Sequence, residues 1–314
     1  MLCQARRRFS SQAKSPLVVV EHHLSRENHL IATLTLNAPP VNSLSLEMLS
    51  ALRDTISEIE ASSCRGFVLA SSHPTIFSAG LDIRELHEPD EMRLRDFWSA
   101  LQDAFLALYG TRCASVAAID GHAPAGGCLL ASACDERIMA TGNFGIGLNE
   151  TKIGIVAPFW FADALYPLIG QRNLERMLQL GSLLSPKEAL EVGLVDTLTE
   201  HGGGNPMNIV NTPVNAGRNT KREQEEEGPP SRGHGLPGFH SPVLREAHKV
   251  LEDYISIDPA ARAASKLLMR SANLRRLQER KQDDLESFVA FCLSPGYQAN
   301  VKSYLAGLKN RKRA

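Results

Sequence analysis

Two glycine-containing turns and one carboxylate are the parts of the sequence best suited to chemistry. Residues 77–82 (FSAGLD) and residues 121–127 (GHAPAGG) each come after an apolar run that is typical of a strand. Backbone N–H groups at a turn that opens into a helix can converge on an oxygen anion. Glu150 follows a further glycine-containing turn. Backbone donors at such turns could stabilise an oxyanion, and a carboxylate such as Glu150 could move a proton.

Each of these features also has a purely structural interpretation. Residues 77–82 alone fit an ordinary turn between a strand and a helix, and residues 124–127 fit a close contact between a strand and a helix. A single Glu in an arbitrary sequence is most often a solvated surface residue. The chemical interpretation therefore depends on the motifs occurring together.

The cysteines and histidines do not support other chemistries. No CxxC pair occurs, and no Cys has a His at metal-ligand spacing, so we predict reduced, mostly buried thiols and no metal site. The cysteines are Cys3, Cys64, Cys113, Cys128, Cys134 and Cys292. Cys128 and Cys134 have no positioned base, which favours a structural role over a nucleophilic one.

The composition is that of a globular chain with little overall charge. Its 314 residues are 43% hydrophobic, enough for a full core, and a net charge of -1 gives no reason to expect nucleic acid as a partner. No run approaches the ~18 apolar residues that a membrane span needs. Residues 1–16 hold basic but no acidic side chains, which is typical of a mitochondrial presequence or of a disordered basic terminus.

Strands and helices alternate around the motifs, which predicts an α/β fold. Strands are expected at residues 17–20, 29–36, 66–70 and 114–119, the first two as a hairpin. Helices are expected at residues 45–59, 93–109, 159–168, 172–180 and 185–192, with a short strand after the last. Ser45 and Ser185 are expected to cap the helices that they open.

The C-terminal third has a break in its pattern. Residues 201–242 are rich in Gly and Pro and include KREQEEE, so they lack the periodicity of a packed element. We predict a disordered insertion there, and a gene-model artefact is an equal alternative. Helical periodicity returns at residue 243, with further helices over residues 258–270 and from Ser294. The predicted division is a presequence (1–16), a core (17–200), the insertion (201–242) and a helical region (243–314).

Four motifs in order carry a family resemblance. FSAGLD, then HAPAGGCLLASACD about 45 residues later, then FGIGLNETKIGI and APFW resemble the crotonase (enoyl-CoA hydratase/isomerase) superfamily, and most of all its Δ3,Δ2-enoyl-CoA isomerases. The match covers roughly residues 17–200 and resumes near residue 243. It implies the ClpP/crotonase-like α/β fold, with repeated ββα units and a C-terminal helical region.

The resemblance also implies roles for particular residues. Family members bind an acyl-CoA thioester and stabilise its enolate with two backbone N–H groups, which here would be those of Leu81 and Gly126. Coenzyme A is part of the substrate, so no separate cofactor is expected. The residues expected to contact the substrate are Ala79, Gly80, Leu81, Asp82, Ile83, Gly126 and Asn149.

The carboxylates distinguish two reactions within the family. Family hydratases position water with two Glu residues, but the first of those positions is Leu129 here and only the second, Glu150, is acidic. A single carboxyl can take a proton from C2 and return it at C4, and this works best with a pKa raised toward neutrality by apolar surroundings. Residues that could supply such surroundings are Phe144, Ile146, Ile153, Ile155 and Phe159.

The resemblance implies an isomerase of unsaturated fatty acid β-oxidation in the mitochondrial matrix, assembled as a homotrimer. Two alternatives stay open. An enoyl-CoA hydratase is disfavoured by Leu129. A non-catalytic crotonase-fold module that binds RNA or another partner has only the basic tail, residues 309–314, in its support.

Overall fold

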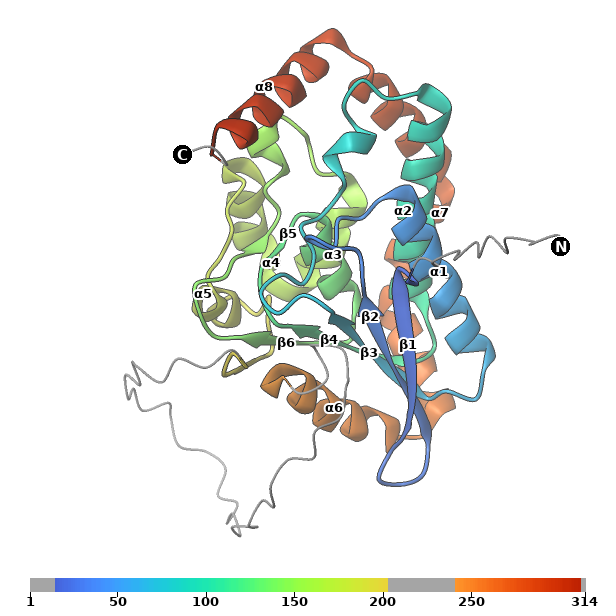
Figure 1. Ribbon diagram of the computed structural model, residues 1–314. Coiled ribbons are helices and arrows are strands. Elements are labelled where there is room, and N and C mark those ends of the chain that lie inside the picture. The colour runs from blue at the N-terminus through green and yellow to red at the C-terminus, as the bar shows by residue number, and fades with distance from the viewer. Residues whose placement is uncertain (1–14, 203–240, 312–314) are drawn as a thin grey trace, which may run out of the picture.

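A six-stranded sheet forms the centre of the molecule. The computed structural model describes residues 15–202 and 241–311 (Figure 1). The sheet has the order β1-β2-β3-β4-β6-β8, in which β1 and β2 are antiparallel and every later pair is parallel. Its strands are β1 (Val18–Leu24), β2 (Leu30–Leu36), β3 (Gly66–Ser71), β4 (Ala114–Ile119), β6 (Glu136–Ala140) and β8 (Thr197–Thr199). The predicted hairpin and the predicted α/β class are confirmed.

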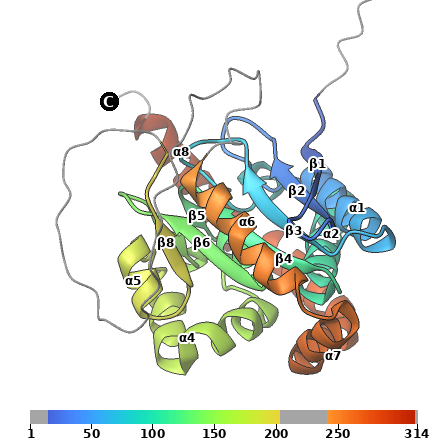
Figure 2. The same ribbon diagram turned by 90° about the horizontal axis from the view of Figure 1, so that it is seen from below.

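Helices cover both faces of this sheet. On one face, the main core lies between the strands and α1 (Leu46–Ala61), α2 (Glu91–Gly110), α3 (Gly126–Ala133) and α4 (Phe159–Leu180). On the other face, α6 (Pro242–Ile255) lies across the strands (Figure 2). Its apolar side chains pack on Ile31, Val68, Val116 and Ile138 in a second, smaller cluster. The C-terminal region therefore completes the fold of the core.

Most helices begin where the sequence predicts. The Ser45 hydroxyl accepts a hydrogen bond from the N–H of Met48 at the start of α1. Ser185 opens α5 (Pro186–Glu191) with a complete capping box to Glu188. The two helices predicted over residues 159–180 are the halves of α4, which breaks at Gly170.

The helix predicted to end near residue 270 is much longer. It forms α7 (Pro259–Cys292), followed by α8 (Pro295–Arg311). No Gly or Pro interrupts the sequence between Pro259 and Pro295, so no signal stops the helix. Leu277, Phe288 and Val289 are buried along its second half, where it packs on α2 and α4. The predicted end near residue 270 was wrong, because packing on α2 and α4 stabilises the helix beyond that point although its apolar periodicity is weak.

The segment predicted to be an insertion leaves and re-enters the fold at one place. Residues 203–240, like residues 1–14 of the predicted presequence, lie outside the described residues. A methyl group placed on Gly202 would lie 3.5 Å from the Cα of Ser241. Ser241 also caps α6 and donates a hydrogen bond of 3.0 Å to Asp120. The two ends are close enough to be joined directly.

Deleting residues 203–240 and joining Gly202 to Ser241 is expected to leave the fold intact. Closing a shorter loop loses less chain entropy, so stability should stay the same or rise by at most about 2 kcal/mol. Urea unfolding of the full chain and of the deletion variant measures this. A variant that fails to fold would contradict the interpretation as an insertion.

Candidate active site

The first glycine-containing turn lies beside the chain before α1. Leu44 and Leu81 form an isolated parallel bridge, in which the Leu44 N–H donates to the Gly80 oxygen (2.9 Å) and the Asp82 N–H donates to the Leu44 oxygen (3.1 Å). In such a bridge the facing residue keeps its own N–H on the opposite side. The N–H of Leu81 therefore points away from Leu44.

The second turn is held by a small parallel sheet. Strands β5 (Ala123–Pro124) and β7 (Ile146–Gly147) pair, and the Ala125 N–H donates to the Gly147 oxygen at 2.8 Å. Helix α3 begins with Gly126, whose N–H is one of the four donors that a helix cannot satisfy internally. The positive end of the helix dipole is at the same point. This turn therefore presents a donor suited to an oxyanion.

The structure brings the two turns together. Gly80 has φ of 83°, and a methyl group added to it would lie 3.0 Å from the Ala125 Cβ and 3.1 Å from the Gly126 nitrogen. A methyl group on Gly126 would lie 3.4 Å from the Leu81 side chain. Glycine at both positions lets the backbones approach this closely. The two donors expected from the sequence thus lie on adjacent turns.

Glu150 is a buried carboxylate at the start of η2 (Glu150–Ile153). The residue is 7% exposed, and neither carboxylate oxygen has a hydrogen-bond partner within the described part of the chain. Burial raises its pKa from 4.5 to about 7. A carboxyl in this state can both accept and release a proton near neutral pH.

The β5–β7 pairing places Glu150 near the second turn. Strand β7 ends three residues before Glu150, and β5 ends two residues before Gly126. Burial raises the pKa of the Cys128 thiol to about 12, and the Glu150 carboxylate acts in the same direction from across this contact. Burial also raises the pKa of Cys134 to about 12. Neither thiol is suited to nucleophilic attack.

The cavity beside Glu150 has walls that the sequence did not reveal. It has a volume of about 220 Å³ and is lined by Thr151, Val156, Ala157, Leu178 and Gln179 as well as by Glu150. The five apolar residues expected from the sequence are not among these lining residues. The end of α4 reaches the cavity only through tertiary packing, so no local signal could have identified Leu178.

The other expected substrate residues have varied positions. Ala79 is exposed, and Ile83 begins η1 (Ile83–Glu85). Asn149 is half-buried at the start of η2. The Asp82 side chain caps η1; burial alone would raise its pKa, but hydrogen bonds and the ion pair with Arg84 outweigh burial and lower it. Asp82 therefore stabilises the turn and is not a free acid.

Leu129 is fully buried in the second half-turn of α3. The position at which family hydratases carry their first Glu is thus apolar and packed in the core. Within the described residues, no group of three or more His, Cys, Asp or Glu could hold a metal ion. Glu150, by contrast, is a buried carboxyl with a pKa of about 7.

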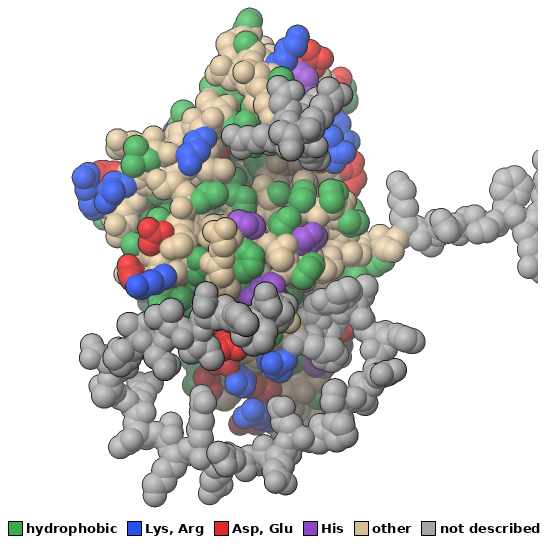
Figure 3. Space-filling view, turned by 60° about the vertical axis from the view of Figure 1, so that its left-hand side comes forward, with side chains coloured by type: hydrophobic (Ala, Val, Ile, Leu, Met, Phe, Trp, Pro, Cys, Tyr) green, Lys and Arg blue, Asp and Glu red, His purple; other side chains and the backbone are tan. Residues whose placement is uncertain are grey.

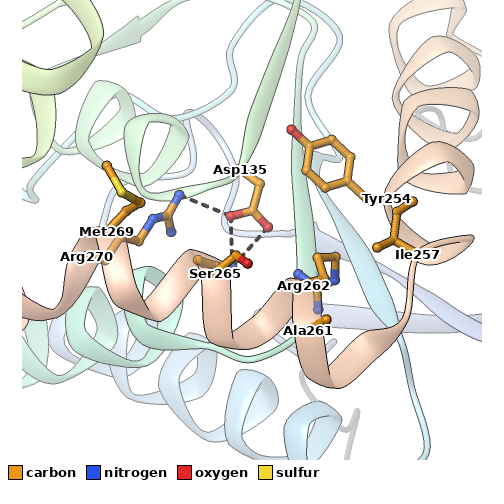
Figure 4. Close-up of a pocket in the computed structure, with 9 residues that line it drawn as sticks. Asp135, Tyr254, Ile257, Ala261, Arg262, Ser265, Met269 and Arg270 are labelled. Atoms are coloured by element: carbon orange, nitrogen blue, oxygen red, sulfur yellow. Dashed lines mark hydrogen bonds and ion pairs between the residues drawn. The ribbon is translucent and has the colours of Figure 1, made fainter.

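A larger cavity, of about 530 Å³, lies under α7 and has a structural explanation (Figure 4). Asp135 points at α7 and pairs with Lys266 (2.9 Å) and Arg270 (3.1 Å). Arg270 also donates to the carbonyl oxygens of Tyr109 and Ala133, near the ends of α2 and α3. Burial lowers the pKa of Lys266. These cations are occupied in joining α7 to the core, so the cavity is a poor candidate for an anion site.

Replacing Asp135 with Ala is expected to destabilise the protein by about 3–5 kcal/mol, because two buried cations lose their carboxylate. Chemical denaturation measures the loss. Asp54→Ala is the matched control: Asp54 pairs with Arg53 on the surface, so its loss should change stability by no more than about 1 kcal/mol. Equal effects of the two substitutions would contradict the role assigned to Asp135.

Comparison with known proteins gives this geometry a context. Residues 26–201 match the family model described as enoyl-CoA hydratase/isomerase. The chain belongs to the enoyl-CoA hydratase/isomerase family. The crotonase-like fold expected from the resemblance is thereby confirmed, and so is the resemblance itself.

Named members of the enoyl-CoA hydratase/isomerase family align with nearly the whole chain. Mitochondrial enoyl-CoA delta isomerase 1 of Homo sapiens is 36% identical over 308 residues, which cover 98% of this chain and 87% of that protein. The Mus musculus protein is 36% identical over 284 residues, which cover 90% of this chain and 85% of that protein. The crystal structure of human mitochondrial delta3-delta2-enoyl-CoA isomerase superposes with a TM-score of 0.78 at 34% identity, covering 94% of this chain and 99% of that one. None of the helices in residues 15–202 and 241–311 is long and apolar enough to cross a membrane.

Proposed function

We propose that this protein is a Δ3,Δ2-enoyl-CoA isomerase in which Glu150 is the single acid/base group. The observation that carries the proposal is the buried Glu150 carboxylate, whose oxygens have no hydrogen-bond partner among the described residues and whose pKa is about 7. It follows β7, whose partner β5 leads into the Gly126 turn. The near full-length similarity to named enoyl-CoA delta isomerases supports the same activity.

The reaction follows from this arrangement. The thioester carbonyl of a 3-enoyl-CoA accepts hydrogen bonds from the N–H groups of Leu81 and Gly126. The Glu150 carboxylate removes a proton from C2, and the electron pair spreads over C2 to C4 and the thioester oxygen. The protonated Glu150 then gives the proton to C4, which leaves the double bond between C2 and C3. No water, metal or redox cofactor enters the balance.

Each group has a physical role in lowering the barrier. A preorganised donor aimed at a developing oxyanion is typically worth about 3 kcal/mol. Burial raises the pKa of Glu150 to about 7. A group with a pKa near neutrality can accept a proton and release it within one turnover. Within the described residues the two carboxylate oxygens have no hydrogen-bond partner, so they are available to take up a proton.

The alternatives receive less support. A hydratase would need a second carboxylate to position water, and Leu129 at that place is fully buried. A nucleic-acid-binding module would need a basic surface. On the face shown in Figure 3, the described Lys and Arg side chains are scattered at the margins among acidic ones, with apolar and His side chains between them. The tail from residue 312 lies outside the described residues.

We also propose a location in the mitochondrial matrix and a homotrimeric assembly. The first rests on the names of the relatives, which are mitochondrial enzymes, and on the basic, acid-free residues 1–16. The second rests on the family resemblance alone. Analytical ultracentrifugation tests the assembly, and microscopy of the tagged full chain tests the location.

Conversion of 3-hexenoyl-CoA to 2-hexenoyl-CoA by the purified full chain tests the proposed function. The product is conjugated with the thioester, so its formation is followed by ultraviolet absorbance. Hydration of 2-hexenoyl-CoA in place of isomerisation would favour the hydratase. A chain that binds acyl-CoA and converts neither substrate would overturn the proposal in favour of a binding module.

The pH dependence of kcat/KM is expected to follow the ionisation of Glu150. The free enzyme needs the carboxylate form to remove the C2 proton, and burial places its pKa at about 7. Activity should therefore fall about tenfold per pH unit below pH 7 and level off above it. A profile measured from pH 5.5 to 9 that stays flat down to pH 5.5 would show that the base has an ordinary carboxyl pKa.

A further inference from the structure

A second cavity lies next to the one that contains Glu150. Its volume is about 280 Å³, and Val156 and Ala157 line both cavities. Its other walls are mostly aromatic, with Trp98, Phe159, Phe288 and Phe291 among them. Trp98 and Phe288 stack with ring centroids 3.4 Å apart. Such walls suit an apolar chain.

The position of this aromatic cavity relates it to the substrate, if the proposed function holds. C2 and C4 must reach Glu150, so carbon atoms beyond C4 continue past the carboxylate. Val156 and Ala157 belong to the walls of both cavities, so the two cavities are neighbours at this segment. The distal part of a longer acyl chain therefore has an apolar space to enter beside this segment.

One of the residues that line the aromatic cavity is acidic. Asp284 on α7 lines the aromatic cavity. Its Oδ2 atom accepts three hydrogen bonds from neutral donors, namely Trp98 Nε1 at 2.8 Å, Trp160 Nε1 at 3.2 Å and Gln102 Nε2 at 2.7 Å. A carboxylate oxygen is the acceptor in all three bonds. They also fix the direction in which it faces the cavity.

Nearby cations have other partners. The guanidinium groups of Arg276 and Arg280 lie over the Phe159 ring, at 4.7 and 4.8 Å from its centroid, and neither residue lines the cavity. Arg276 pairs with Asp163 at 2.7 Å. Lys281, one turn before Asp284, forms an ion pair with Asp103. Asp284 is the charged residue among those that line the cavity, while Arg276 and Arg280 contact the Phe159 ring.

We propose that Asp284 makes this enzyme selective for acyl chains with an uncharged end, by excluding chains that end in a carboxylate. A terminal carboxylate that enters the cavity would lose part of its water and would face a like charge at short range. A binding site can be selective because one of its groups repels the competing ligand. A neutral end meets only apolar contacts.

Three 3-enoyl-CoA substrates of equal chain length test the proposal. Their twelve-carbon acyl chains end in a methyl group, a carboxylate or the methyl ester of that carboxylate. We expect kcat/KM of the wild type to be about 10- to 100-fold lower for the carboxylate than for the ester, because only the charge repels. Equal values for carboxylate and ester would overturn the proposal. Failure of the wild type on 3-hexenoyl-CoA would instead contradict the proposed function.

Asp284→Asn removes the charge and keeps an acceptor for the two indole N–H groups. For each enzyme we divide kcat/KM for the ester-ended substrate by kcat/KM for the carboxylate-ended substrate. This ratio should fall to about threefold or less in the variant. Glu286→Gln is the matched control, because Glu286 lies on the same helix but pairs with Arg95 on the surface; its ratio should equal that of the wild type. An unchanged ratio in Asp284→Asn would overturn the role of Asp284.

A third probe keeps the proposal testable if Asp284→Asn does not fold. A chain of the same length that ends in a trimethylammonium group should be a better substrate of the wild type than the carboxylate-ended chain, since a carboxylate between aromatic rings attracts a cation. If the cationic and anionic chains are rejected equally, the cavity excludes all charge by desolvation, and Asp284 has no part in the selectivity.

Discussion

Replacing Glu150 with Gln is expected to lower kcat for 3-hexenoyl-CoA about 10²- to 10⁴-fold. The amide has nearly the same shape but cannot take the C2 proton, while the backbone donors of Leu81 and Gly126 are untouched. Binding should therefore change little. Stopped-flow absorbance gives the rate, and inhibition by a saturated acyl-CoA gives the affinity.

The same variant should show the folding penalty of the buried carboxylate. Folding raises the pKa of Glu150 from 4.5 to about 7, so between these values the folded state binds more protons than the unfolded state. The wild type thus loses stability as the pH rises toward 7, and Glu150→Gln does not. Between pH 5.5 and 8.5 the difference in unfolding free energy should shift by about 2 kcal/mol in favour of the variant.

Glu191→Gln, at the exposed end of α5, is the matched control and should change neither quantity. An unchanged rate in Glu150→Gln would remove Glu150 from the mechanism. A lowered rate with a pH-independent stability difference would keep its chemical role but contradict its raised pKa.

Replacing Gly80 with Ala is expected to lower kcat about 100-fold. The new methyl group would meet the Ala125 Cβ at 3.0 Å and the Gly126 nitrogen at 3.1 Å, so the two turns must separate. Loss of one aligned donor in an oxyanion hole typically costs a factor of 10² to 10³. Ala at a φ of 83° also strains the backbone by about 1–2 kcal/mol.

Gly170→Ala separates this strain from the effect on the turns. Gly170 has a similar φ of 70°, and no atom lies within 4 Å of the position of an added methyl group. Gly170→Ala should lose about as much stability as Gly80→Ala but keep the kcat of the wild type. If both variants keep the wild-type rate at a temperature where they are folded, the oxyanion donors do not lie at these turns.

The sequence predicts the site better than it predicts the site's surroundings. The turns and Glu150 occur in short motifs, and each motif requires a local backbone shape that Gly at positions 80 and 126 permits. The cavity walls come from elsewhere: Leu178 lies on α4 and Asp284 on α7. Their approach depends on how helices pack, which no local spacing encodes.

Secondary structure follows the same division. Ser45 and Ser185 cap helices because side chains a few residues apart satisfy the first N–H groups, which is a local effect. The extension of α7 to Cys292 depends on distant partners, since Phe288 stacks on Trp98 and Asp284 bonds to two indoles. Local rules determine where the helix begins, and packing on distant partners stabilises its second half.

The helix that covers the outer face of the sheet has a consequence for biosynthesis. The ribosome completes strands β1 to β8 before it adds residues 203–240, and only then α6. Until α6 emerges, Ile31, Val68, Val116 and Ile138 form an uncovered apolar surface on an otherwise complete sheet. Such a surface promotes association between nascent chains. The sheet is therefore protected on this face only once a helix encoded late in the chain has docked across it.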